Sequence, residues 1–529
     1  MQAAGGIEQQ GKRVDCVLIY PPWTVLYGRA FLTNCLPPLG LLTIAACLER
    51  EGYSVRIIDV NAERIDSDEL RERLQEYQPR YVGLTVLSSM VVSSHCIAKL
   101  VKEVVPDCTI ALGGVHPELY PELMLRNSAV DLVIRGDGER PMIDLVSGKA
   151  WSEVPGASYR TQDLKVVHNP IGPLLTDLDC LPMPAYHMVD FKNYFPSASS
   201  YRNLPAMNII ATRGCPGKCT FCNSANTGLR GRSAQNVFEQ IKHLHDSYGI
   251  RQIQFFDDTF TANKKMVLEL CELMAQAKLN ITFSCYARGD CFNEKMAAAL
   301  KSAGCHQVMI GIETGSDKLA KLMGKPIKKE NYKTVVDMAH RHGIEVRAGF
   351  IIGHQEETLE TMHETLNFAM ELDVDYFQLS LLTPYPGTQL YRQALAEKRL
   401  VHQEFKYYGQ SRVLLKLNHL SEEEVLAFER YSFRKFYIRP QVAWRMIKRL
   451  RNLRQLKDLT NALFILVLNR FKSEKPKWTD WDDAEEEDQY DLILKGSDVQ
   501  ASLVPPRLTW EVRESKSIMK RPKSTSLRV

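Results

Sequence analysis

The sequence has no strong excess of one charge and no long hydrophobic run. Its 67 lysines and arginines are nearly balanced by 63 aspartates and glutamates, which leaves a formal net charge of +4. Domains that bind nucleic acid usually carry a clear basic excess, so we do not expect that function. The longest apolar run, residues 462–468, is far shorter than the roughly 20 residues that span a bilayer, and we expect no transmembrane helix.

The chain also lacks the features of a secreted protein. Residues 1–12 show no signal-peptide pattern, and the thirteen cysteines are an odd number. Secreted proteins usually pair their cysteines in disulfides, so free thiols and a cytoplasmic location fit better. With 529 residues the chain is too long for one ordinary hydrophobic core, and we expect two or three domains.

Three of the cysteines form the most informative pattern in the chain. Cys215, Cys219 and Cys222 have the spacing C-x₃-C-x₂-C, directly after a strand-like run. Gly214 and Gly217 would let this loop fold tightly. Three thiolates on such a loop can bind three irons of a [4Fe–4S] cluster and leave the fourth iron without a protein ligand.

Two other interpretations of the cysteines stay open on spacing alone. One is a structural zinc site, which normally has four ligands. No fourth ligand follows closely, because the nearest histidines, His243 and His245, fall on an expected helix. The other is a chance grouping of buried thiols, since short cysteine patterns are common.

The surrounding sequence favours the cluster, because residues 204–391 resemble the catalytic barrel of the radical S-adenosylmethionine (SAM) enzymes. In that family the cysteine loop binds the cluster, and the open iron is chelated by the amino and carboxylate groups of SAM. Phe221, directly before the last cysteine, matches the aromatic residue usual at that position and is expected at the cofactor site. The resemblance implies that Cys215, Cys219 and Cys222 are the metal ligands.

Strands and helices alternate along this region. The pattern predicts a partial (β/α)₆ barrel rather than the complete eight-unit barrel. In such barrels the chemistry collects at the carboxyl ends of the strands. The six strand-like segments are residues 207–212, 253–256, 282–287, 307–312, 346–352 and 376–382.

Five residues at those carboxyl ends are candidates for SAM binding. The resemblance implies that Asp257 and Asp258 approach the amino group of SAM. It also implies that Glu313 meets the ribose or the carboxylate and that Gly349 lies beside the adenine, while Arg288 follows the third strand. Each has a structural alternative: the aspartates could cap the next helix, Arg288 could pair with Glu313, and Gly349 could ease strand packing. Their shared position favours cofactor binding.

Residues 1–146 contain a different alternation of short β-branched runs and helical stretches. Near-continuous apolar strands separated by helices predict a doubly wound parallel sheet of the Rossmann or flavodoxin type. Ligands of such sheets bind beyond the carboxyl ends of the strands. The expected strands are residues 14–20, 54–60, 81–87, 109–112 and 132–135.

The loops after these strands resemble those of the amino-terminal domain of cobalamin-binding radical SAM enzymes. The motifs are Pro-Pro-Leu-Gly at residues 37–40, Gly-Gly-Val-His-Pro at 113–117 and Arg-Gly-Asp-Gly-Glu at 135–139. Ordinary tight turns would explain any single glycine. The resemblance implies cobalamin as a cofactor, and the residues expected to contact it are Ser88, Gly113, Gly114, Gly136 and Glu139.

The loop after the first expected strand, residues 20–28, departs from the usual cobalamin pattern. Many cobalamin domains have Asp-x-His-x-x-Gly after the first strand, and that histidine is the lower ligand of cobalt. Residues 20–28 contain no histidine, so we expect cobalt without a histidine on its lower face. His116 is a further candidate contact, although a turn histidine that faces solvent is the favoured interpretation.

The remaining segments flank the two domains. Residues 147–203 are expected to be a proline-rich connector with one hairpin, made of residues 157–160 and 165–168. Residues 392–472 are expected to be helical, and residues 473–529 to be a disordered tail. The helical region is basic at residues 439–457, with Trp444, Met446 and Ile447 expected on one face. Packing on the barrel is favoured there, with peripheral membrane contact as the alternative.

The family resemblance implies the chemistry. We expect a cobalamin-dependent radical SAM C-methyltransferase that methylates an unactivated carbon through a 5′-deoxyadenosyl radical and methylcobalamin. Its substrate would be a small or lipid-like molecule, and a flavodoxin or ferredoxin would supply electrons. Two alternatives stay open: an oxidative cyclase or rearrangement enzyme of the same class without methyl transfer, and a non-catalytic cobalamin or metal sensor.

Overall fold

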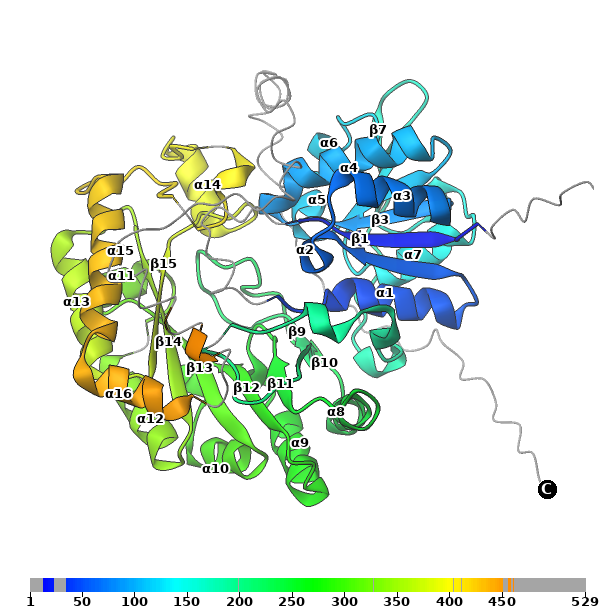
Figure 1. Ribbon diagram of the computed structural model, residues 1–529. Coiled ribbons are helices and arrows are strands. Elements are labelled where there is room, and N and C mark those ends of the chain that lie inside the picture. The colour runs from blue at the N-terminus through cyan, green and yellow to red at the C-terminus, as the bar shows by residue number, and fades with distance from the viewer. Residues whose placement is uncertain are drawn as a thin grey trace, which may run out of the picture.

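The computed structural model describes residues 13–22, 35–197, 199–326, 328–402, 404–410 and 412–450, together with 455–457 and 460. Two α/β domains follow one another along the chain, and Figure 1 shows them side by side. The tail expected at residues 473–529 lies outside the described residues. No helix in the described ranges is long and apolar enough to cross a membrane.

The first domain is built on a seven-stranded sheet. Its strands are β1 (Cys16–Tyr20), β2 (Val55–Asp59), β3 (Tyr81–Thr85), β4 (Thr109–Gly113), β5 (Leu132–Ile134), β6 (Ala157–Arg160) and β7 (Val166–His168). In space the order is β2-β1-β3-β4-β5-β6-β7, and the first five of these are parallel. This confirms the predicted doubly wound sheet, in the flavodoxin-like order. The hairpin β6–β7 forms and joins the sheet antiparallel to β5.

Helices cover both faces of this sheet. On one face lie α1 (Leu39–Arg50) and α7 (Glu139–Val146), and on the other lie α3 (Ser67–Tyr77) and α4 (Val91–Val104). Alternate residues of β1 reach the two layers: Leu18 packs with α1 and α7, and Ile19 packs with α3 and α4. A strand that is apolar on both faces is typical of a parallel sheet covered on both sides. The short helices are α2 (Val60–Glu63), α5 (Val115–Leu119) and α6 (Pro121–Met124).

The second domain is a curved sheet of six parallel strands in the order β15-β14-β13-β12-β11-β8. This confirms the partial barrel. The strands are β8 (Ala206–Ile209), β11 (Gln252–Phe255), β12 (Thr282–Ala287), β13 (Cys305–Glu313), β14 (Glu345–Ile352) and β15 (Tyr376–Leu381). The helices around it are α8 (Ala234–Tyr248), α9 (Lys264–Ala277), α10 (Glu294–Ser302), α11 (Asp317–Leu322), α12 (Lys329–Arg341), α13 (Leu359–Glu371) and α14 (Gln389–Ala396).

The barrel strands have an apolar outer face and a more polar inner face. Ile253 and Phe283 are buried in the core shared with the surrounding helices. The next residues along the two strands, Gln254 and Ser284, are paired in register and therefore lie together on the opposite face. Polar side chains thus line the barrel interior at this level, and Nε2 of Gln254 donates to the Ser200 carbonyl of the connector at 3.0 Å.

Two helices close the described part of the chain, α15 (Glu422–Tyr437) and α16 (Pro440–Arg449), and both pack on the barrel. Met446 packs against the barrel core, whereas Trp444 and Ile447 are more than half exposed. The expectation that these three residues share a face is therefore wrong. At about 100° per residue, Met446 points away from Trp444, two positions earlier.

Candidate cofactor-binding site

The cysteine loop lies between two short antiparallel strands, β9 (Thr212–Arg213) and β10 (Arg230–Gly231). The backbone of Cys215 pairs with Ala225 in an isolated bridge, and the Asn226 amide donates to the Gly217 carbonyl at 2.7 Å. Gly214 has a φ of +92°, and a Cβ at this position would collide with the carbonyl of Gly228. The predicted tight loop therefore depends on this glycine.

The three cysteines of this loop are free thiols in a polar backbone environment. The Gly217 amide lies 3.4 Å from Sγ of Cys215, and Oγ1 of Thr259 lies 3.3 Å from the same sulfur. Burial raises the pKa of Cys222 to about 11, so metal binding must displace a proton from this thiol.

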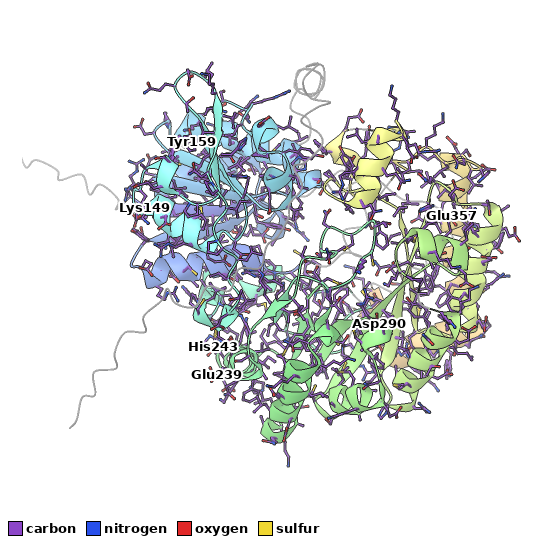
Figure 2. The ribbon with its side chains drawn as sticks, turned by 180° about the vertical axis from the view of Figure 1, so that it is seen from behind. Lys149, Tyr159, Glu239, His243, Asp290 and Glu357 are labelled. Atoms are coloured by element: carbon purple, nitrogen blue, oxygen red, sulfur yellow. The ribbon has the colours of Figure 1, made fainter. Side chains whose placement is uncertain are left out.

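Three soft thiolate donors on one compact loop fit an iron–sulfur cluster, which bonds each thiolate to a different iron. Within the described residues, no three His, Cys, Asp or Glu side chains are close enough to share a single metal ion. His243, the nearest histidine in the sequence, lies with Glu239 on α8, at the outside of the barrel (Figure 2).

Asp258 braces the cysteine loop. Its Oδ2 accepts from the Gly214 amide at 3.2 Å, and its Oδ1 accepts from the Ser224 hydroxyl at 2.7 Å. The expected alternative, a helix cap, is wrong, because the side chain of Asn263 caps α9. Asp258 therefore contacts the loop directly, as a residue of the cofactor site would.

Asp257 is buried beside the same loop. Its Oδ1 accepts from the amide and the hydroxyl of Thr212, at 2.5 and 2.6 Å, and its Oδ2 has no partner within the described structure. Burial raises the pKa of Asp257 to about 7. A buried carboxyl with a vacant oxygen is a ready hydrogen-bonding group for a ligand at this end of β11.

Glu313 ends β13 in an unusual backbone conformation. Its φ is +70°, and the register with β14 shifts between Gly311 and Glu313. Its Oε1 lies 2.7 Å from Nζ of Lys325, and both side chains are largely buried. Although burial opposes the charge of Lys325, the Glu313 carboxylate holds the lysine pKa above its usual range. The sequence analysis did not identify Lys325, because only the tertiary fold brings it to Glu313.

Arg288 lies against the cysteine loop rather than beside Glu313. Its guanidinium pairs with Asp290 at 3.0 and 2.8 Å, and the hydrogen bond to Asp290 raises the arginine pKa further. A Cβ on Gly217 would come within 2.5 Å of Nη1 of Arg288. The suggested Arg288–Glu313 pair is therefore wrong. Asp290 holds the Arg288 guanidinium beside the cysteine loop instead.

Phe221 lies against an apolar cluster, whereas Gly349 lies within the barrel sheet. Phe221 packs against a small apolar cluster that contains Met323 and Leu390. Gly349 faces Gly311 across β13 and β14, and a Cβ on Gly349 would meet no atom closer than 3.9 Å. Strand packing therefore does not require this glycine. The neighbouring Gly311 is different, because a Cβ there would meet Oε1 of Glu313 at 2.3 Å and Nζ of Lys325 at 2.9 Å.

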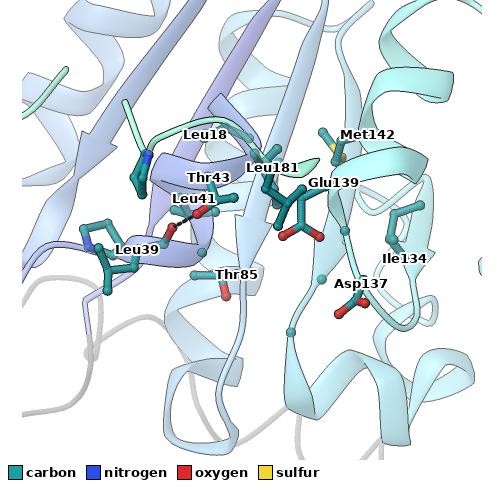
Figure 3. A pocket seen from close by; sticks show the side chains of 18 of the residues that line it. Leu18, Leu39, Leu41, Thr43, Thr85, Ile134, Asp137, Glu139, Met142 and Leu181 are labelled. Carbon is teal, nitrogen blue, oxygen red and sulfur yellow. Dashed lines mark hydrogen bonds between the residues drawn. The ribbon is translucent and has the colours of Figure 1, made fainter. Parts of the chain in front are cut away.

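The second candidate site is a cavity of about 420 Å³ at the carboxyl ends of the first sheet (Figure 3). Its size lies in the range of roughly 300–1,000 Å³ typical of small-molecule sites. Gly113, Gly114, Gly136 and Glu139 line it, as predicted for loop residues of this domain. The barrel domain contributes Ile210, Arg213, Arg232 and Gln240, so the cavity lies between the two domains.

Ser88 and His116 lie outside this lining. The Ser88 hydroxyl is 3.1 Å from Nδ1 of His116, whose ring is fully buried against Tyr120 and Phe405. Burial lowers the pKa of His116 to about 3. The expectation of a solvent-facing histidine is wrong, because the segment around Phe405, far along the chain, covers this turn.

Comparisons with known proteins match both domains. Residues 29–146 match the family model of the B12 binding domain, and residues 209–369 match that of the radical SAM superfamily. The chain is 34% identical over 439 residues to an uncharacterised methyltransferase of Pyrococcus horikoshii, covering 82% of this chain and 94% of the relative. It is 27% identical over 443 residues to the cytidylyl-2-hydroxyethylphosphonate methyltransferase of Streptomyces wedmorensis, covering 73% and 83%.

A further relative is similar in sequence, and two solved structures share the fold. The anaerobic magnesium-protoporphyrin IX monomethyl ester cyclase of Rubrivivax gelatinosus is 26% identical over 428 residues, covering 78% of this chain and 75% of the relative. The methyltransferase TsrM of Kitasatospora setae matches with a TM-score of 0.61, 19% identity, and coverage of 74% and 79%. The cobalamin-dependent enzyme OxsB matches with a TM-score of 0.67, 19% identity, and coverage of 85% and 70%.

These matches cover both domains and include a relative above 30% identity that is matched over nearly its whole length. They confirm the family predicted from the cysteine loop and the glycine-rich motifs. The chain belongs to the cobalamin-binding enzymes of the radical SAM superfamily.

Proposed function

We propose that this chain is a cobalamin-dependent radical SAM methyltransferase that transfers a methyl group to carbon in a small-molecule substrate. The observation that carries the proposal is the direct connection between the two candidate cofactor sites. Arg213, two residues before Cys215, also lines the cavity of the first domain. The cavity proposed for cobalamin and the loop proposed for the cluster thus meet at Arg213 of β9.

Each cofactor site has residues suited to one task. When bound, the cluster, SAM and cobalamin supply a carbon radical and a transferable methyl group. Asp258 and the glycines of the loop hold the three cysteines in place. Asp257, Arg288, Glu313 and Gly349 are proposed to bind SAM, with Lys325 fixing the side chain of Glu313. The barrel interior would keep water from the radical.

The remaining partners follow from this chemistry. A one-electron donor such as a flavodoxin or ferredoxin would reduce the cluster. A reducing cytoplasm would suit the free thiols of this chain. The substrate would be a small molecule bound at the carboxyl ends of the barrel strands, beside the residues proposed to bind SAM. Relatives named for methyl transfer to a phosphonate and to hopanoids differ widely in the molecules they are named for, so family membership does not fix the substrate.

A second candidate function is oxidative cyclisation. It is favoured by the similarity to the magnesium-protoporphyrin cyclase of Rubrivivax gelatinosus, which covers 78% of this chain. The same fold serves both reactions, so fold alone does not separate them.

Methyl-labelled SAM separates the two functions. The reconstituted enzyme is incubated without oxygen with hydroxocobalamin, a strong reductant and SAM that carries ¹³C in its methyl group. We expect the label on the extracted corrinoid, with S-adenosylhomocysteine formed in equal amount. An unlabelled corrinoid, together with reductive cleavage of SAM to 5′-deoxyadenosine, would favour the cyclase function.

A further inference from the structure

One oxygen in the cavity between the domains has no protein partner. Glu139 begins α7 and is 5% exposed. Its Oε1 accepts a hydrogen bond from Arg213, whereas its Oε2 is buried without a partner. Figure 3 shows this carboxylate among the side chains that line the cavity. A buried carboxylate oxygen is costly to leave unpaired, so a ligand in the cavity is its natural partner.

Several other polar side chains of the lining already have partners. Thr43 donates to the Leu39 carbonyl at 2.8 Å, and Arg232 donates to Asn236 at 2.9 Å. Asp137 uses both carboxylate oxygens, which accept from Arg213, Arg230 and the Leu175 amide. Among the described residues that line the cavity, Oε2 of Glu139 is the one buried side-chain oxygen that lacks a hydrogen bond.

The rest of the cavity suits a flat ring. Its walls are mainly apolar side chains, among them Leu18, Leu41, Leu84, Leu112, Met142 and Leu181. Gly83 forms part of the wall, and the side chains of Leu18 and Met142 pack directly against it, since a Cβ there would lie 2.8 and 3.4 Å from them. An apolar slot with a single carboxylate acceptor matches a heteroaromatic base attached to a hydroxyl-bearing ribose.

We propose that Oε2 of Glu139 accepts a hydrogen bond from a ribose hydroxyl of the nucleotide tail of the bound corrinoid, and that Glu139 thereby makes the cavity selective for corrinoids that carry this tail. The inference rests on the proposed use of cobalamin. It assigns to Glu139 the recognition of the tail, separate from its ion pair with Arg213.

The test compares two corrinoids and two variants of the full, cluster-loaded enzyme. Cobinamide has the corrin ring of cobalamin but no nucleotide tail, so it lacks the proposed hydroxyl. Equilibrium dialysis measures the affinity for hydroxocobalamin and for cobinamide. Glu139→Gln keeps the size of the side chain and an acceptor for Arg213, but places an amide N–H where the carboxylate offers an oxygen.

Wild-type enzyme is expected to bind cobalamin more tightly than cobinamide. In Glu139→Gln the affinity for cobalamin should fall about tenfold, as for the loss of one hydrogen bond, while the affinity for cobinamide stays the same. Asp137→Asn is the matched control, because Asp137 shares the Arg213 partner but has no vacant oxygen. It should change the two affinities by the same factor.

Equal loss of both affinities in Glu139→Gln would overturn the inference, and so would no loss of either. Iron content and the thermal unfolding midpoint of each variant show that it is folded. If wild-type enzyme binds neither corrinoid, the proposed cobalamin function fails as well, which a change confined to the Gln variant would not imply.

Discussion

Arg213 and Asp137 form an ion pair between the two domains, with 3.1 Å from Nη1 to Oδ1. Arg230, paired with Arg213 across β9 and β10, reaches the other oxygen of the same aspartate. Both arginines flank the cysteine loop, and Asp137 belongs to the glycine-rich loop after β5. The cysteine loop and the cavity of the first domain are therefore held together by side-chain ion pairs.

Replacing Arg213 should weaken this contact. Arg213→Ala leaves the buried Glu139 without its cationic partner, and we expect a loss of about 3 kcal/mol from the interface between the domains. Thermal unfolding followed by circular dichroism should show a midpoint several degrees lower. Arg71→Ala removes a solvent-exposed ion pair with Glu103 and should cost about 0–1 kcal/mol. Equal unfolding midpoints for the two variants would contradict the proposed role of Arg213 in holding the two domains together.

Replacing Lys325 should impair SAM binding without loss of the cluster. Lys325→Met leaves Glu313 buried and unpaired at the end of β13, so its side chain should leave the position proposed to contact SAM. The change that SAM causes in the electron paramagnetic resonance spectrum of the reduced cluster should be lost, with iron content unchanged. Lys318→Met, which removes an exposed lysine 3.5 Å from Glu356, serves as the control and should behave as wild type. A normal response to SAM in Lys325→Met would count against the role of this pair.

Replacing Asp258 should loosen the cysteine loop. Asp258→Ala removes the acceptor for the Gly214 amide and the Ser224 hydroxyl, and Ser224→Ala removes only the second of these bonds. We expect the iron content of Asp258→Ala to fall severalfold and that of Ser224→Ala to fall less. The absorbance of the reconstituted cluster in the presence of a chelator measures the difference. Equal cluster stability in wild type and Asp258→Ala would show that the loop does not need this brace.

The acid side of the stability profile should depend on Asp375. Burial alone would raise its pKa, but the hydrogen bond from His340 and the charge of Arg449 lower it to about 2. A carboxyl with a lowered folded-state pKa adds stability above its unfolded value of 3.8, and this stability is lost as the pH falls toward 2. The pKa of His340 is raised by the same bond, so its contribution is complete below 6.5 and declines at higher pH.

Denaturant midpoints at pH 3 and pH 5.5 test this pair. Between these values wild type should lose about 1 kcal/mol more than Asp375→Asn, which cannot titrate at this position. Asp107→Asn alters an exposed aspartate in the turn before β4 and should keep the wild-type pH dependence. Identical pH profiles for wild type and Asp375→Asn would show that the network around Asp375 does not titrate as described.

The sequence predicted the parts of the molecule that local pattern determines. The spacing of the cysteines, Gly214 in the loop and the apolar runs of the eleven parallel strands all act over a few residues, and each stands where it was expected. Residues that depend on distant contacts were not predictable in the same way. Lys325 meets Glu313 because α11, between them, brings the chain back to the end of β13, and His116 is buried by Phe405, 289 positions later. The local sequence pattern around Lys325 or His116 gives no sign of these contacts.

The most direct test of the central claim is an anaerobic assay of iron and SAM cleavage in wild type and in Cys215→Ala, Cys219→Ala and Cys222→Ala. Reconstituted wild type should contain about four irons per chain and form 5′-deoxyadenosine from SAM after reduction, as a three-cysteine [4Fe–4S] site requires. Each alanine variant should form none. Bound zinc in place of iron, or undiminished SAM cleavage in the variants, would contradict the account.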